Sequence, residues 1–185
     1  MNKNRKTTVV IGVLILLAYS ILGTNNPEAK IQGMLLEIIS GLSVIAIAVL
    51  MYPYLTPYGN RLTKWYLFLK GLEGILMIVA GVLFFIHTPL LLALRDHIYL
   101  IHGYIFAIPA LIFYYLLYLS KLIPPWLSIW GIIAAILLVI VNILELMTII
   151  SPLEILYLPI VLNEVVLAIW LIVKGFNSQS LRASC

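Results

Sequence analysis

The chain has 185 residues, of which 64% are apolar and only 10% are charged, and its formal net charge is +4. An ordinary soluble domain contains about 25% charged residues, and a soluble fold of this length cannot bury so much apolar side-chain surface. The composition therefore predicts an integral protein of the lipid bilayer and excludes nucleic-acid binding. The single cysteine, Cys185, excludes an intrachain disulfide and a cysteine-rich metal site.

Six stretches are apolar enough to cross a membrane, since a helix needs about 20 mainly apolar residues to span roughly 30 Å of hydrocarbon. They cover residues 8–23, 34–52, 65–87, 99–119, 126–147 and 155–175. We expect the second and third spans to be joined by a turn over residues 53–60. The apolar connection at residues 87–97 is expected to lie in the membrane interface. The sequence thus predicts an all-α bundle of six transmembrane helices, forming one domain over residues 1–185.

Lysine and arginine are unevenly shared between the two sides of this bundle. The side with both termini would hold Lys3, Arg5, Lys6, Arg61, Lys64, Lys121, Lys174 and Arg182, and the other side only Lys30 and Arg95. Because cytoplasmic segments have an excess of basic residues, we expect both termini to lie on the cytoplasmic side. We expect the membrane to be the plasma membrane of a prokaryotic cell. The tryptophans expected as interfacial anchors fall on the same side: Trp65, Trp126, Trp130 and Trp170.

The start of the chain allows two interpretations. A basic segment followed by a short apolar run is typical of a cleaved signal peptide. No clear small-residue cleavage site follows the run, which favours an uncleaved membrane anchor.

Ionisable side chains inside membrane spans are costly and usually face the bundle interior. A rise of 1.5 Å per residue places four polar groups in the outer half of the bundle and two nearer its midplane. The outer groups are Glu37, His102, Asn142 and Glu145, and the deeper ones are Asn163 and Glu164. One interpretation joins all of them except Asn163 in an outward-facing pocket for a cation, proton, metal ion or polar headgroup. The alternative leaves Glu37, His102 and Glu145 in the hydrated headgroup zone, whereas Glu164 is too deep for water.

Helical spacing relates two further groups of residues. Lys70 and Glu73, in the inner half of the third span, are three residues apart and can pair on their own helix. In the fifth span, small and polar residues that include Gly131 and Ala135 recur at alternating spacings of three and four. This stripe is typical of a close helix–helix seam, and it is a candidate docking face for a partner helix.

No local catalytic motif occurs in the chain. It lacks His-Glu-x-x-His, Gly-x-Ser-x-Gly, a glycine-rich phosphate-binding loop and Cys-x-x-Cys, and Asp96 is its only aspartate. The spacing of His87, Asp96, His97 and His102 matches no local pair of metal ligands, which favours interfacial histidines over a metal site. No motif implies a cofactor.

Two stretches and the opening residues resemble a known family. Residues 118–131 contain Lys121 and the run Pro124-Pro-Trp-Leu-Ser-Ile-Trp-Gly, and residues 158–176 contain the Asn163-Glu164 pair. Together with Asn4-Arg-Lys-Thr7, they resemble a large prokaryotic family of small multi-helix membrane proteins that is catalogued only as a domain of unknown function. The resemblance covers most of the chain and is strongest in the last third. It implies about six spans and no assigned activity.

Three functions remain open from the sequence. The first is a membrane protein whose interior binds a small polar ligand, ion or proton near Glu164. The second is a membrane-embedded metal-dependent hydrolase that uses Glu37, His102, Glu145 and Glu164. The third is a structural or regulatory subunit that docks a partner helix on the face of Gly131 and Ala135.

Overall fold

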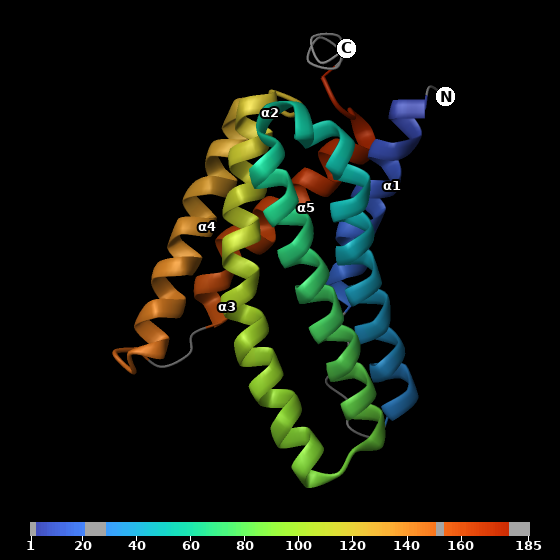
Figure 1. The fold of residues 1–185 in the computed structure, drawn as a ribbon, viewed down its shortest axis with the longest axis vertical. Coiled ribbons are helices and arrows are strands. Elements are labelled where there is room, and N and C mark those ends of the chain that lie inside the picture. Colours follow the sequence, from blue (N-terminus) through green and yellow to red (C-terminus); the bar gives the residue numbers. More distant parts are fainter. Residues whose placement is uncertain (1–2, 21–28, 151–153, 178–185) are drawn as a thin grey trace.

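The computed structural model describes residues 3–20, 29–150 and 154–177, and this part of the chain is helical and contains no strand. The helices are α1 (Lys3–Ala18), α2 (Lys30–Ile86), α3 (Pro89–Ser120), α4 (Pro125–Leu146) and α5 (Leu158–Val173), with a 3₁₀ turn, η2 (Glu154–Tyr157), before α5. They pack as one elongated bundle in which α1 lies against α2 and α5, and α3 against α2 and α4 (Figure 1).

Helix α2 is a hairpin of two helical arms. Gly59 has non-helical backbone angles (φ 174°, ψ 76°) and separates residues 30–58 from residues 60–86. The two arms run side by side in opposite directions (Figure 1). Gly41 of one arm lies against Gly74 of the other. The predicted turn over residues 53–60 is therefore too long, because Pro53 and Pro57 lie inside the first arm. Apolar helices tolerate proline where neighbouring side chains compensate the backbone.

The connection between α2 and α3 is very short. His87 ends α2 in a left-handed conformation (φ 57°), and the Thr88 hydroxyl accepts a hydrogen bond from the Leu91 amide at 3.4 Å. Threonine as the cap and Pro89 in the first turn are strong signals for a helix start. The predicted connection over residues 87–97 is therefore too long, since α3 begins at Pro89 and includes Arg95.

The remaining bounds differ from the predicted spans at their ends. Helix α1 begins at Lys3 rather than at residue 8, because lysine and arginine are good helix formers, and the predicted residues 21–23 lie outside the described residues. Helix α4 matches the prediction within one residue at each end. Helix α5 ends at Val173, and Gly175 follows with a φ of 77°.

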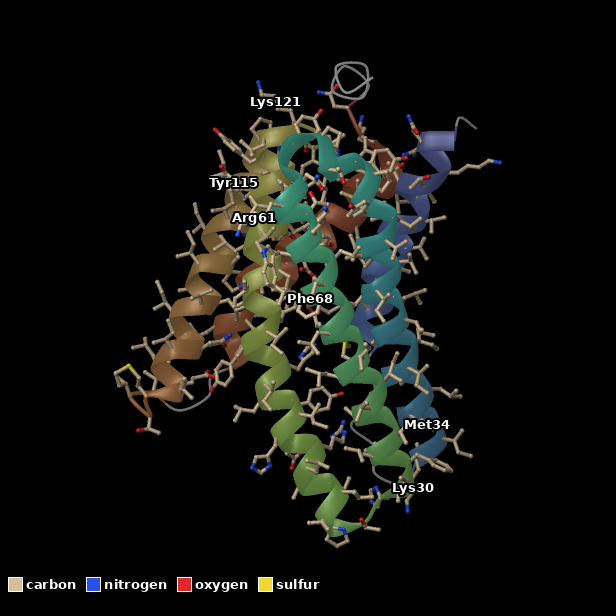
Figure 2. All side chains as sticks on the ribbon, in the orientation of Figure 1. Lys30, Met34, Arg61, Phe68, Tyr115 and Lys121 are labelled. Carbon is tan, nitrogen blue, oxygen red and sulfur yellow. The ribbon has the colours of Figure 1, made fainter. Side chains whose placement is uncertain are left out.

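The start of α1, the end of α5, the turn of α2 and the connection from α3 to α4 lie at one end of the bundle (Figure 1). Lys121 marks that end, and Lys30 and Met34 lie at the opposite end (Figure 2). Four described helical segments are long and apolar enough to cross a membrane, namely α2, α3, α4 and Ile155–Val173.

The stripe of small residues on α4 packs inside the bundle. Gly131 lies directly against the ring of Tyr114, and Ala135 is 0% exposed. Glycine is required at this contact, since a methyl group would overlap the ring. A partner helix docked on the face of Gly131 and Ala135 would have to displace α3.

Candidate functional site

A cavity of about 290 Å³ opens in the middle of the bundle between α1, both arms of α2, α3 and the start of α5. Most of its walls are apolar. Its polar and aromatic lining comprises Tyr19, Tyr66, Lys70, Glu73, His102, Phe106, Phe113, Tyr157 and Glu164. Binding sites for small molecules are typically concave and apolar with a few convergent polar groups, and this cavity has that character at the small end of the usual size range.

An ion pair lies on the α2 side of the cavity. Lys70 Nζ is 3.0 Å from Glu73 Oε2 on the same helix, as the three-residue spacing predicts, and both side chains are buried. The ammonium group also lies 4.6 Å from the centre of the Phe106 ring on α3. Because it has a carboxylate on one side and an aromatic face on another, Lys70 is held at the wall of the cavity.

His102 projects from α3 towards this ion pair. Its Nε2 lies 3.9 Å from Glu73 Oε1, which is too long for a hydrogen bond, and it has no hydrogen-bond partner among the described residues. The imidazole packs between Tyr99 and Phe106, with ring centroids 6.0 and 6.4 Å away. The ring is therefore fixed in position while one buried nitrogen is left for another partner, which in an apolar setting is an unfavourable state.

Glu164 faces the cavity from α5. Its Oε2 accepts a hydrogen bond of 2.8 Å from the hydroxyl of Tyr19, which immediately follows α1. Tyr19 places a hydrogen-bond donor on the carboxyl group, so this pair joins the N-terminal helix to the last one. Because Glu73 and Glu164 line the same cavity, two carboxyl groups and one ammonium group share it.

The structure changes the predicted grouping of polar residues. Lys70 and Glu73 were placed in the inner half of the bundle, apart from the outer polar groups, but they share one cavity with His102 and Glu164. The discrepancy follows from counting depth separately along each helix, because that count ignores how neighbouring helices are offset along the bundle.

Glu37 belongs to a different cluster nearer the end marked by Lys30. Its Oε1 accepts a hydrogen bond of 3.2 Å from Arg95 Nε and a second from Arg95 Nη2. The guanidinium carbon also lies 4.9 Å from the Phe84 ring centre and 4.7 Å from that of Tyr99. The Glu37 side chain is 0% exposed, so it is a buried ion-pair partner and does not line the cavity.

Asn142 and Glu145 meet at a third place. The Tyr157 hydroxyl contacts Asn142 Oδ1 at 3.3 Å and Glu145 Oε2 at 3.2 Å, and Asn142 Nδ2 donates to the Gly103 carbonyl at 3.0 Å. Asn163, fully buried, donates to the Leu127 carbonyl at 3.1 Å. These contacts tie α3, α4 and α5 together. The single predicted pocket therefore corresponds to three polar clusters, and the third of them shares Tyr157 with the central cavity.

No three His, Cys, Asp or Glu side chains within the described ranges gather closely enough to hold a metal ion. The set predicted for a metal-dependent hydrolase, Glu37, His102, Glu145 and Glu164, is thus spread over the three clusters. His87 and His97 each place Nδ1 near a backbone carbonyl of their own helical segment, at 3.3 and 2.7 Å. Each of these contacts joins a histidine ring to the backbone of its own helical segment.

Sequence reasoning missed the tyrosines of the site. Tyr19, Tyr66 and Tyr157 all line the cavity. Tyrosine has an apolar ring with a polar tip, so in a membrane sequence it is as typical of the interface as of the interior. Only the partners of the hydroxyl group distinguish an interfacial tyrosine from an interior one. Those partners come from helices that are distant in the sequence.

Apolar helices packed around a cavity with charged side chains define an integral membrane protein with an internal polar site. A family model described as a domain of unknown function (DUF4386) matches residues 17–175, and the chain belongs to this family. The match confirms the resemblance found in the sequence. No curated protein and no solved structure matches the chain. Because the family has no assigned activity, any function must be argued from the site.

Proposed function

We propose that the chain is a ligand-binding membrane protein whose central cavity holds a small amphipathic molecule with a hydrogen-bond-donating or cationic group. The supporting observation is the convergence of Lys70, Glu73, His102 and Glu164 on one cavity with mainly apolar walls. Apolar walls accept the hydrocarbon part of a ligand, and the polar groups fix its orientation.

The charges in the cavity favour a donor group on the ligand. In formal charges, two carboxyl groups face one ammonium group, and Lys70 is already paired with Glu73. Glu164 has the Tyr19 hydroxyl as its partner at one oxygen. A ligand amine or hydroxyl next to Glu164 would add a charge-assisted hydrogen bond in a site of low dielectric constant, where such bonds are strong.

Substitution of Glu164 by glutamine is expected to release this ligand. The amide keeps the size of the side chain but loses the negative charge that attracts the donor group. Native mass spectrometry in mild detergent checks this, with wild-type protein retaining an adduct that Glu164→Gln loses. Asp96→Asn is the control, since Asp96 is exposed outside the cavity and its substitution should leave the adduct in place. The proposal would be contradicted if all three proteins retained the adduct to the same extent, or if none of them carried one.

We also propose that the chain crosses a cell membrane six times, with both termini in the cytoplasm. The two arms of α2, together with α1, α3, α4 and α5, supply six helical segments in the described part of the chain. The start of α1 and the end of α5 lie at the same end of the bundle (Figure 1). That end holds Lys121, and the uneven distribution of basic residues assigns it to the cytoplasm.

Thiol labelling in intact cells tests this topology. The only native cysteine is Cys185, which lies outside the described residues, and a membrane-impermeant maleimide should leave it unlabelled until the cells are opened. In a Cys185→Ser background, Leu90→Cys should react in intact cells, because Leu90 is 79% exposed at the start of α3. Labelling of Cys185 in sealed cells, together with protection of Leu90→Cys, would indicate the opposite orientation and contradict the proposed topology.

A further inference from the structure

In the proposed function, Lys70 is only a charge that Glu73 neutralises. Its side chain is 11% exposed and lines the central cavity from the second arm of α2. Two other lining residues flank its ammonium group: both carboxylate oxygens of Glu73 lie 3.0 Å from Nζ, and the Phe106 ring centre lies 4.6 Å away. A primary amine and a carboxylate therefore lie side by side at the wall of a mainly apolar space.

The Lys70–Glu73 pair does not join two helices. Its members are three residues apart on one arm of α2, whereas the Glu37–Arg95 pair links α2 to α3. Replacing a buried ion pair by well-packed apolar residues is often neutral or stabilising, because both charges lose their hydration on burial. An apolar side chain at position 70 could also pack on the Phe106 ring. Assembly of the bundle thus does not require this lysine, and ionisable groups inside membrane spans indicate a functional site.

Glu73 can convert the Lys70 ammonium group into a nucleophile. Transfer of one proton to the carboxylate leaves a neutral amine and a neutral acid, and neutral groups cost less to bury in an apolar site than charged ones. Lysine amines that are desolvated in apolar pockets form Schiff bases with carbonyl compounds. The cavity therefore contains a candidate nucleophile and its base within one helical turn.

We propose that Lys70 forms an imine with a small apolar aldehyde that enters the central cavity. The amine of Nζ attacks the carbonyl carbon, a C–N bond forms, and the oxygen takes a proton from Glu73 to give a carbinolamine. Glu73 then accepts a second proton from the nitrogen and delivers it to the hydroxyl group, the C–O bond breaks and water leaves. One ammonium group and one aldehyde thus give one protonated imine and one water, and Glu73 is again a carboxylate.

The cavity walls determine the class of aldehyde. They are mainly apolar and include the rings of Tyr66, Phe106 and Phe113, so they favour a hydrocarbon chain over a polar one. The positive charge of the imine would occupy the place of the ammonium group. It would keep Glu73 as its counter-ion and Phe106 as its aromatic neighbour, so neither interaction of the charge is lost.

Reductive trapping tests the proposal in the detergent-solubilised chain. The protein is incubated with an equimolar amount of octanal at neutral pH, sodium cyanoborohydride reduces the imine to a stable secondary amine, and peptide mass mapping locates the octyl group. Lys64 is the internal comparison, because it is exposed on the same arm and outside the cavity. An exposed lysine amine is almost fully protonated at neutral pH, so Lys70 should carry at least about tenfold more octyl group than Lys64. Labelling of Lys64 equal to or above that of Lys70 would overturn the proposal.

Glu73→Gln removes the base and the counter-ion, and it should lower trapping at Lys70 by at least about 100-fold, the usual effect of a lost general base. Asp96→Asn is its matched control, because Asp96 is an exposed carboxyl outside the cavity and the substitution should keep wild-type trapping. Equal trapping in the two variants would overturn the mechanism. If Glu73→Gln does not fold, the ratio of Lys70 to Lys64 labelling in wild-type protein decides alone. Failure of trapping contradicts the imine only, since the adduct that Glu164→Gln is expected to lose is measured without octanal or reductant.

Discussion

Replacement of Arg95 by methionine is expected to lower the free energy of unfolding by about 3–5 kcal/mol. The Glu37 carboxyl is 0% exposed, and Arg95, at 16%, is its ion-pair partner. Methionine keeps much of the packing between Phe84 and Tyr99 but removes the guanidinium group. A buried carboxyl would then lose its charged partner, and its desolvation cost would no longer be offset. Equilibrium unfolding in mixed micelles with increasing denaturing detergent measures the change.

Two comparisons make this result specific to the ion pair. Arg61→Met removes an exposed arginine and should change the free energy of unfolding by less than about 0.5 kcal/mol. The double variant Glu37→Gln/Arg95→Met should recover part of the loss, since it leaves no unpaired charge in the interior. If Arg95→Met were no less stable than Arg61→Met, the buried pair would not stabilise the bundle.

Substitution of Gly74 by alanine is expected to destabilise the protein by about 1–3 kcal/mol, the usual cost of overpacking. A Cβ atom at Gly74 would lie 2.5 Å from the backbone oxygen of Gly41 and the same distance from a side-chain carbon of Ile45. The backbone oxygen belongs to the other arm of α2 and cannot move without separating the arms. Small residues at such crossings let helix backbones approach closely in membranes.

Gly71→Ala is the matched control for this prediction. Gly71 lies on the same arm, but a Cβ atom there would meet nothing within 4 Å. Alanine also has the higher helix propensity, so Gly71→Ala should be neutral or stabilising by up to about 1 kcal/mol. Detergent-induced unfolding measures the stability of both variants. Equal stabilities of Gly74→Ala and Gly71→Ala would show that the arms of α2 are not in tight contact.

The helical architecture was predictable because apolar stretches of sufficient length form membrane-spanning helices. All six predicted spans overlap helical segments of the structure, and the errors lie at the connections. Thr88-Pro89 is a helix-start signal, but the low polarity of residues 87–97 suggested an interfacial segment instead. Pro53 and Pro57 suggested a turn because proline usually interrupts helices. The chain turns instead at Gly59.

The candidate site was less predictable, because it depends on which helices are neighbours. Sequence reasoning selected Glu164 and His102 from the cost of burying polar groups, and both line the cavity. It also assigned Glu37 to this pocket. No spacing rule relates residue 37 to residue 95, so the sequence did not indicate that Glu37 pairs with Arg95 instead. The Tyr19–Glu164 bond spans 145 positions, so no local pattern indicates it.

The three polar clusters divide structural and binding roles within one small bundle. The Glu37–Arg95 pair and the Tyr157 contacts join helices within the chain, although Glu37 Oε2 and Glu145 Oε1 have no hydrogen-bond partner among the described residues. The central cavity also contains an unpartnered nitrogen, Nε2 of His102, and this nitrogen lies beside two carboxyl groups that line the open space of the cavity. Buried polar groups that lack partners are costly, and a bound molecule that supplies the missing hydrogen bonds would offset that cost.

The most direct test of the central claim is a crystal structure of the chain purified with its native lipids and grown in a lipidic mesophase. The proposal predicts density for a bound molecule in the cavity of about 290 Å³, with a donor atom within hydrogen-bond distance of the Glu164 carboxyl. The same density should be absent from crystals of Glu164→Gln. A cavity closed by its own side chains in the wild-type crystal would contradict the proposal.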